Sequence, residues 1–404
     1  MAGGDVTDGR RAEVPVLIDG LQYSNWSEAI FRQMNAVGLA AVHVTICYHE
    51  DFRETVENVT AWNRRFEAYP DLIMPGRTAD DVRAARESGR TAIIFGFQNP
   101  SPIEDDIGLV EVWHQLGARF MQLSYNNQSL LATGCYEAED PGITRMGRQV
   151  IAEMNRVGLV VDMSHSAERS TLEAIELSDR PIAITHANPS FWHAALRNKS
   201  DDVLRALGQS GGMLGFSLYP HHLAGKSDCT VADFCAMVAR TADLMGVERI
   251  GFGSDLCQDQ PDSVVEWMRN GTWTRARDFG EGSASDAGFP PQPDWFANSL
   301  GFASIVDGLR DVGFSAEDVA RIAGGNWLDF FAAYCRPAPG RPRPHCHSVV
   351  FTVIGLQGFV VDRPVLTHTV QALDPEIGRV EARVMPRVQD RTAADAVEIG
   401  DLDR

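Results

Sequence analysis

No stretch of the 404 residues approaches the roughly 18 consecutive apolar residues that a membrane-spanning helix needs. The opening residues, MAGGDVTDGRRAEVPV, also lack the apolar run that forms the centre of a signal peptide. From these two absences we expect a cytoplasmic protein with no membrane partner.

Basic residues are scarce relative to acidic ones. The chain has 36 lysines and arginines against 55 aspartates and glutamates, which gives a formal net charge of -19 at pH 7. Such a surface repels the phosphates of nucleic acids and the headgroups of anionic membranes, so both are excluded as expected partners.

Cysteine spacing excludes a redox or zinc motif built on paired thiols. The seven cysteines are an odd number, and no two of them stand in a C-x-x-C arrangement. A chain of this length buries a large core without disulfides. We therefore expect reduced thiols, as in most cytosolic proteins.

Short apolar runs alternate with amphipathic helical patterns between residues 16 and 333. The eight predicted strands are 16–19, 40–46, 91–97, 120–125, 159–165, 182–187, 213–218 and 250–255. The predicted helices between them are 27–37, 78–89, 107–117, 146–157, 167–177, 200–209 and 230–245. This alternation predicts a parallel sheet, and eight strands favour a closed (β/α)8 TIM barrel. The alternative is an open doubly wound sheet, but no G-x-G-x-x-G follows the first strand to support its dinucleotide-binding form.

The predicted domain organisation is an N-terminal extension at 1–15, the barrel at 16–335, and an appended C-terminal tail at 336–404. The tail opens with the Pro- and Arg-rich linker RPAPGRPRP. Two closing helices are predicted at 298–312 and 315–333. A long polar stretch, 256–297, follows the eighth strand, and loops of that length in a compact domain are usually functional. We expect it to lie over the mouth of the barrel.

Polar side chains stand where the predicted strands end. In a TIM barrel the carboxyl ends of the strands line the active site. The residues in such positions are Gln98, Tyr125, Asn126, His165, His186 and Asp255. Two imidazoles and a carboxylate converging on one mouth are typical ligands of Zn²⁺ or a similar ion, which activates water for hydrolysis. The neighbouring His221 and His222 follow another strand and are weaker candidates for a contact with substrate.

Five segments carry a resemblance to a known family. They are GITRMGRQVIAEMNRVGLVVDMSHSA (142–167), RPIAITHANPS (180–190), ALRNKSDDVLRALGQSGGMLGF (195–216), IGFGSDL (250–256) and GGNWL (324–328). In this order they resemble the membrane (renal) dipeptidase family, peptidase family M19 of the metallo-dependent hydrolases. The resemblance spans about residues 16–335.

The resemblance implies a role for several residues. His165 and His186 correspond to ligands of the family's second metal, and Asp255 to an aspartate that contacts the metal and its water. Arg197 matches the arginine that grips a substrate carboxylate, a group that guanidinium binds through two parallel hydrogen bonds. Asn198 lies beside it. Tyr125 takes the place of a histidine that touches substrate, with Asn126 next to it.

The sequence departs from the family at the first metal. Leu21 and Tyr23 replace the histidine and aspartate that bind it, and Gln98 replaces the glutamate that bridges both ions. We therefore expect one divalent ion per chain, Zn²⁺, held by His165, His186 and the Gln98 oxygen. Asp255 contacts the same centre and serves as general base on its water.

The function expected from these residues is metal-dependent hydrolysis of a small amide or dipeptide with a free carboxylate. One alternative is a related barrel enzyme of small amino-acid or betaine catabolism that cleaves a C–N bond or decarboxylates. The other is a barrel that binds its ligand without turnover. A homodimer is compatible with the sequence and is not required by it.

Overall fold

The computed structural model describes residues 15–271 and 274–334. Most of the predicted N-terminal extension and all of the predicted tail at 336–404 lie outside these residues. Within them, nine strands form one parallel sheet: β1 (Leu17–Gln22), β2 (Leu39–Cys47), β3 (Ile73–Pro75), β4 (Thr91–Phe97), β5 (Ala118–Gln122), β6 (Val160–Asp162), β7 (Ala183–Ile184), β8 (Met213–Phe216) and β9 (Ile250–Phe252).

The pairing of the strands closes eight of them into a barrel. The order is β2-β1-β9-β8-β7-β6-β5-β4-β3, and β2 also pairs with β4. That last pairing completes the ring and leaves β3 outside it, bound to β4 alone. The predicted (β/α)8 barrel is confirmed, and each of its eight strands overlaps a predicted one, although several are shorter than predicted. The three-residue β3 is too short to show a period in the sequence.

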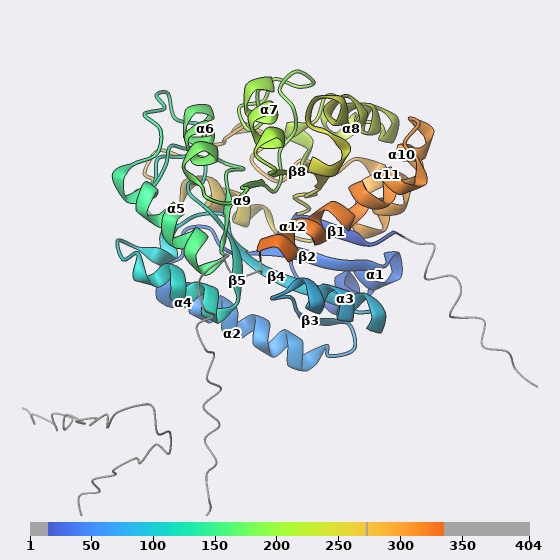
Figure 1. Ribbon diagram of the computed structural model, residues 1–404, viewed down its shortest axis with the longest axis horizontal. Coiled ribbons are helices and arrows are strands. Elements are labelled where there is room, and N and C mark those ends of the chain that lie inside the picture. Colours follow the sequence, from blue (N-terminus) through green and yellow to red (C-terminus); the bar gives the residue numbers. More distant parts are fainter. Residues whose placement is uncertain (1–14, 272–273, 335–404) are drawn as a thin grey trace, which may run out of the picture. The chain divides into compact units, whose positions relative to one another are not determined.

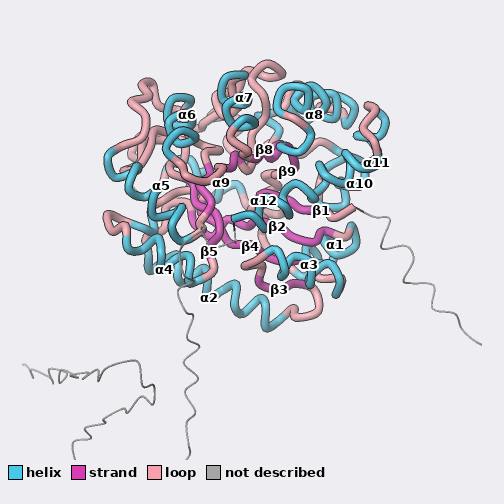
Figure 2. The backbone as a smooth tube through the Cα atoms, viewed as in Figure 1, coloured by secondary structure: helices cyan, strands magenta, loops and turns pink. Residues whose placement is uncertain are grey.

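Helices surround the barrel, as Figures 1 and 2 show. They are α1 (Glu28–Val37), α2 (Phe52–Ala68), α3 (Ala79–Ser88), α4 (Gly108–Leu116), α5 (Arg145–Val157), α6 (Glu168–Leu177), α7 (Asp201–Gln209), α8 (Val231–Met245), α9 (Asp262–Asn270), α10 (Phe302–Asp311), α11 (Ala316–Ala320) and α12 (Asn326–Tyr334). The seven helices predicted between strands are present within one residue at each end, while α2 and α9 were not predicted. None of the helices in the described ranges is long and apolar enough to span a membrane.

Local side-chain bonds set where the helices begin. The Ser200 side chain accepts a hydrogen bond from the backbone of Val203 at the start of α7. At the start of α2, Asp51 and Glu54 bond each other's backbone in a capping box. Such caps satisfy N–H groups that the first turn leaves free. The predicted helix at 315–333 is interrupted by a π-helical turn, Arg321–Gly325, because Gly324 leaves helical geometry.

The amino-terminal end of the barrel is packed shut by α12. The Trp327 Nε1 atom donates to the Phe252 carbonyl at 2.9 Å, and the ring of Phe331 stacks on that of Phe120. Above them, the His43 ring stacks on Phe120 with 4.5 Å between centroids. The opposite, carboxyl-terminal end of the barrel is therefore the end left for a functional cavity.

Candidate active site

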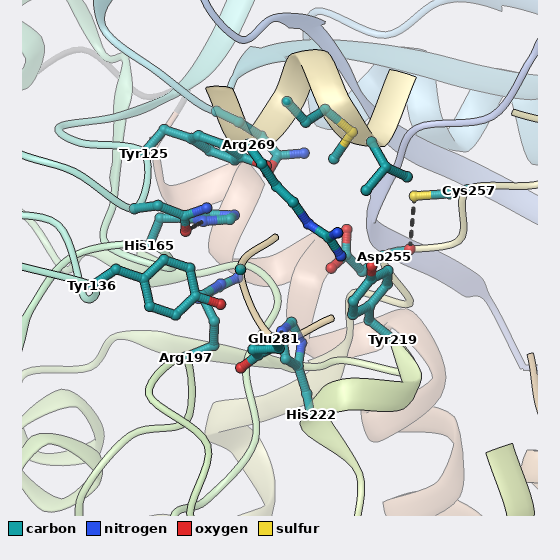
Figure 3. Close-up of a pocket in the computed structure, with 15 residues that line it drawn as sticks. Tyr125, Tyr136, His165, Arg197, Tyr219, His222, Asp255, Cys257, Arg269 and Glu281 are labelled. Carbon is teal, nitrogen blue, oxygen red and sulfur yellow. Dashed lines mark hydrogen bonds and ion pairs between the residues drawn. The ribbon is translucent and has the colours of Figure 1, made fainter. Parts of the chain in front are cut away.

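A cavity of about 60 Å³ lies at the carboxyl-terminal mouth of the barrel (Figure 3). Strands on opposite sides of the ring contribute its lining. The sequence-predicted residues that line it are Gln98, Tyr125, Asn126, His165, Arg197 and Asp255. The fold therefore brings six predicted site residues together from segments that follow five different strands. His186 does not line the cavity, but its ring contacts that of His165, which does.

The rings of His165 and His186 face each other, with their Nε2 atoms 3.0 Å apart. On the other side of each ring, Nδ1 meets an oxygen. The His165 Nδ1 atom lies 2.6 Å from the amide oxygen of Asn126, which only accepts, so this nitrogen carries the proton. The His186 Nδ1 atom lies 2.8 Å from the Thr185 hydroxyl, whose own proton goes to Asp162. The His186 Nδ1 atom therefore carries a proton and donates it to the Thr185 hydroxyl oxygen.

Both Nε2 atoms therefore present lone pairs to each other. Burial lowers the pKa of both histidines well below the usual value, and the nearby Arg197 lowers it further, so both rings are neutral at pH 7. Two facing lone pairs repel unless a cation lies between or beside them. This donor set fits a divalent metal, which prefers neutral imidazoles whose second nitrogen is hydrogen-bonded to the protein.

A third ligand from the acidic, cysteine or histidine side chains is missing. Among the described residues, no three His, Cys, Asp or Glu side chains are grouped to hold an ion. The prediction that Asp255 also binds the metal stays a prediction: it follows β9, whereas the histidines follow β6 and β7. Gln98 remains available. Its Nε2 donates to Thr45 and Tyr48, both at 2.8 Å, so the amide oxygen is the atom that could serve as the predicted ligand.

The end of β1, where the family holds its first metal, contains no ligand. Leu21 is fully buried there, and the Tyr23 ring packs edge-on against Tyr48 with 4.7 Å between centroids. Asp19 accepts hydrogen bonds from the Ser254 backbone and hydroxyl, at 2.7 and 2.5 Å. Packed hydrocarbon and a satisfied carboxylate occupy this position, and the loss of the first site stays a prediction.

Arg197 is a buried cation without an anionic partner in the described structure. Its side chain is 1% exposed. Its guanidinium donates to the backbone carbonyls of Ser164 and His186. No carboxylate oxygen of a described residue lies within 4.0 Å of it. A desolvated guanidinium without a counter-charge is costly unless a ligand supplies one.

Asp255 has an unusual backbone and a perturbed pKa. Its φ of 57° lies in the left-handed region, and its backbone N–H donates to the Leu21 carbonyl at 3.0 Å. Burial raises the pKa of its carboxyl to about 7, and Arg197 opposes this rise. A pKa near neutrality suits a group that takes up and releases protons during a reaction.

Of the remaining predicted residues, Tyr125 forms a wall of the cavity, while Asn126 and Asn198 hold other groups in place. The Tyr125 ring lies 4.2 Å from that of His165, measured between centroids, and forms one wall. Asn126 orients His165 by the bond described above. Asn198 does not line the cavity: its amide donates to the backbone carbonyls of His193 and His222 and accepts from the Asn188 backbone. These bonds tie the loops around Arg197 together, and the contact of Asn198 with substrate stays a prediction.

The segment after β9 covers the cavity, as predicted for 256–297. It contributes Cys257, residues of α9 and Glu281. The lining residues that were not predicted are Tyr136, Tyr219, Cys257, Val265, Met268, Arg269, Gly280 and Glu281. Tyr219 and Cys257 stand just after predicted strands and could have been found by that position, whereas the others follow their strands at a distance in sequence. His222, a weaker candidate in the sequence, lines the cavity, and its neighbour His221 does not.

Comparison of this sequence with known proteins finds a matching protein family. Residues 24–269 match the membrane dipeptidase family, peptidase family M19. The dipeptidase tcpJ of Claviceps purpurea is 28% identical over 213 residues, which are 52% of this chain and 50% of that protein. The chain spans 50 to 61% of the length of the two fungal dipeptidases tcpJ and aclJ.

Solved structures cover the barrel more fully. An amidohydrolase from Pseudomonas aeruginosa is 33% identical with a TM-score of 0.76, and the match covers 80% of this chain and 98% of that one. A metallopeptidase from Rhodobacter sphaeroides, liganded with a phosphinate mimic of the dipeptide L-Ala-D-Ala, shares the fold. Its TM-score is 0.66 at 17% identity, over 79% of this chain and 99% of that one.

Proposed function

Because this chain belongs to the membrane dipeptidase family, peptidase family M19, we propose that it hydrolyses a small amide or dipeptide that carries a free carboxylate. One observation carries the proposal. A buried guanidinium without a described counter-ion, Arg197, lines the same cavity as His165, whose Nε2 faces that of His186. A carboxylate-bearing substrate would supply the missing anion beside the metal ligands.

The implied cofactor is a divalent metal, which we propose to be one Zn²⁺ per chain. His165, His186 and the Gln98 oxygen would hold it. When bound, such an ion polarises a carbonyl and makes water more acidic. We place the protein in the cytoplasm as part of the same proposal.

The chain's own residues then have separate tasks. Arg197 holds the substrate carboxylate through charge-assisted hydrogen bonds. Asp255 accepts the proton of the attacking water and delivers it to the leaving amine, a task that fits its pKa of about 7. The Tyr125 wall, together with the cover after β9, excludes bulk water and so strengthens these electrostatic contacts.

The test is an assay of purified protein, with measured metal content, against dipeptides, N-acyl amino acids and N-methylated amino acids. Amine release that disappears with a chelator and returns with Zn²⁺ is expected. Carbon dioxide release, or binding without turnover, would contradict hydrolysis and favour the two alternatives, decarboxylation and an inactive ligand-binding barrel.

A further inference from the structure

A second cavity, of about 470 Å³, lies beside the catalytic one and has no part in the proposed hydrolysis. Segments that follow β2, β4 and β5 line this outer cavity. Its volume falls in the range of about 300–1,000 Å³ that small-molecule sites occupy, whereas the catalytic cavity measures about 60 Å³. The outer cavity therefore has room for a small ligand as it stands.

Apolar side chains form much of the wall of the outer cavity. Pro100, Ile103, Tyr125 and Leu130 line it, and Leu130 remains 60% exposed. A single exposed leucine is ordinary, but apolar residues gathered around one cavity are typical of ligand sites. The body of a ligand that fits here is therefore apolar.

Glu104 brings a negative charge to this lining. Its φ of 50° and ψ of -126° are unusual for a residue other than glycine, and residues strained in this way cluster at functional sites. The exposed carboxylate accepts one long hydrogen bond, of 3.4 Å, from the Phe52 backbone. It forms no ion pair with a lysine or arginine of the described residues. The outer cavity therefore presents an anion whose counter-ion this part of the chain does not supply.

The other polar groups of the lining are neutral. Burial lowers the pKa of His49, so its imidazole carries no charge at pH 7. The amide nitrogen of Asn99 donates to the His49 Nδ1 atom at 3.4 Å, which leaves the amide oxygen as a further acceptor. A carboxylate, neutral acceptors and apolar walls together complement an organic cation.

His49 also connects the outer cavity to the covering segment. Because its Nδ1 accepts a hydrogen bond, its Nε2 carries the ring proton and donates to the Met268 carbonyl at 3.0 Å. The ring of Trp267 packs edge-on against the imidazole, with 5.4 Å between centroids. Both residues lie on α9, and Met268 lines the catalytic cavity. A ligand that touches His49 therefore acts directly on the helix that covers the active site.

One interpretation is that the outer cavity receives a side chain of the substrate itself. The position of Tyr125 argues against it. This residue lines both cavities, and its ring contacts His165 of the catalytic cavity and His49 of the outer one, at 4.2 and 5.7 Å between centroids. The ring stands as a wall between the two cavities, so the outer one takes a separate molecule.

We propose that the outer cavity is a second binding site, for a small organic cation with an apolar body, and that its ligand steadies α9 through His49. Glu104 binds the cationic group, while Ile103 and Leu130 pack against the apolar body. The site does not depend on the proposed hydrolysis, because it shares only the Tyr125 wall with the catalytic cavity.

The test measures binding of phenethylammonium and of its neutral counterpart, 2-phenylethanol, by ligand-observed NMR titration of the full chain. The wild type is expected to bind phenethylammonium about fivefold more tightly, the effect of one exposed ion pair. Glu104→Gln, which keeps the shape of the side chain, is expected to lose this preference. A variant that still prefers the cation, or a wild type that binds neither probe or both equally, would overturn the site.

Two control variants locate the binding. Asp105→Asn removes a charge from the exposed neighbour of Glu104, which does not line the outer cavity. Glu281→Gln removes an acidic group of the catalytic cavity. Both variants are expected to keep the preference for phenethylammonium. Loss of the preference in Glu281→Gln would place the probe in the catalytic cavity and contradict the proposal.

Hydrogen–deuterium exchange tests the connection to the covering segment. Saturating phenethylammonium is expected to slow the exchange of α9 amides and to leave those of α7 unchanged. His49→Phe keeps a ring against Trp267 but has no donor for the Met268 carbonyl. This variant should bind the probe and show less slowing in α9. A wild type that binds the probe with unchanged exchange in α9 would contradict the role of His49.

Discussion

Arg197 and Asp255 carry opposite charges in one cavity, yet no guanidinium nitrogen of the former lies within 4.0 Å of a carboxylate oxygen of the latter. The guanidinium is thus held by two backbone carbonyls and has no anionic partner among the residues that the structure describes. A cation preserved in this state is prepared for a carboxylate from outside the chain.

Arg197→Met is expected to lower kcat/KM for carboxylate substrates by at least about tenfold, because a desolvated charge pair is worth on the order of 2–5 kcal/mol. The measurement is steady-state kinetics on a peptide and on the same peptide with its carboxylate amidated. Amidation should cost the wild type as much as the mutation does and should cost the variant little. Equal kinetics of variant and wild type on the free carboxylate would remove Arg197 from the binding site.

At most one tightly bound divalent ion per chain is expected, since packed Leu21 and Tyr23 replace the ligands of a first site. Elemental analysis after dialysis measures it. His165→Ala and His186→Ala should each lose the ion, while His114→Gln, in the last turn of α4 and outside the cavity lining, should keep it. Two ions per chain without added excess would contradict this count.

Asp255→Asn tests the division between ligand and base. Asp255 follows β9, whereas the facing histidines follow β6 and β7, so we expect the variant to retain the metal. Its kcat should fall by about 10²–10⁴-fold, the usual contribution of a general base. Metal content and kcat, both measured on the same preparation of the variant, distinguish a metal ligand from a general base. Loss of the ion together with activity would make Asp255 a ligand after all.

His43 makes the fold sensitive to acid. Its Nδ1 lies 2.7 Å from the Gly20 carbonyl, and its Nε2 is buried without a partner among described residues. Burial lowers its pKa from 6.5 to about 4. Below pH 6.5 the unfolded chain takes up a proton that the folded chain refuses, so stability falls with pH until about 4.

His43→Asn keeps a donor for Gly20 and does not titrate. Between pH 7.5 and 5.0 the wild type should lose about 2 kcal/mol more unfolding free energy than this variant. Urea denaturation of both proteins at the two pH values measures the difference. An identical loss in both would show that His43 is protonated without cost in the folded state.

The barrel was predictable because its signals are local and repeated. Apolar runs such as Thr91–Phe97 and caps such as Ser200 each specify one element, and eight such elements specify the ring. The helix α2 was not predicted, although Asp51 and Glu54 form a capping box that marks its start. Strand β3 has only three residues and no pattern to find. A strand of this length is too short for an alternating or apolar pattern to be recognised in the sequence.

Site residues were predictable only at strand ends. His165, Arg197 and Asp255 stand directly after strands or in a recognisable loop. Glu281 follows β9 by almost thirty residues, and only the path of the covering segment brings it to the cavity. The distance of Asp255 from the histidine pair was not predictable either, because it depends on the positions of their strands around the ring.

The covering segment also has a kinetic consequence. A cavity of about 60 Å³ has room for only a few water molecules, and a dipeptide is larger. We therefore expect the covering segment, which brings Met268, Arg269 and Glu281 to the cavity, to move before a ligand docks and again before products leave. Encounter with substrate should then be slower than diffusion, and the frequency of this opening would set an upper limit on turnover even where bond cleavage is fast.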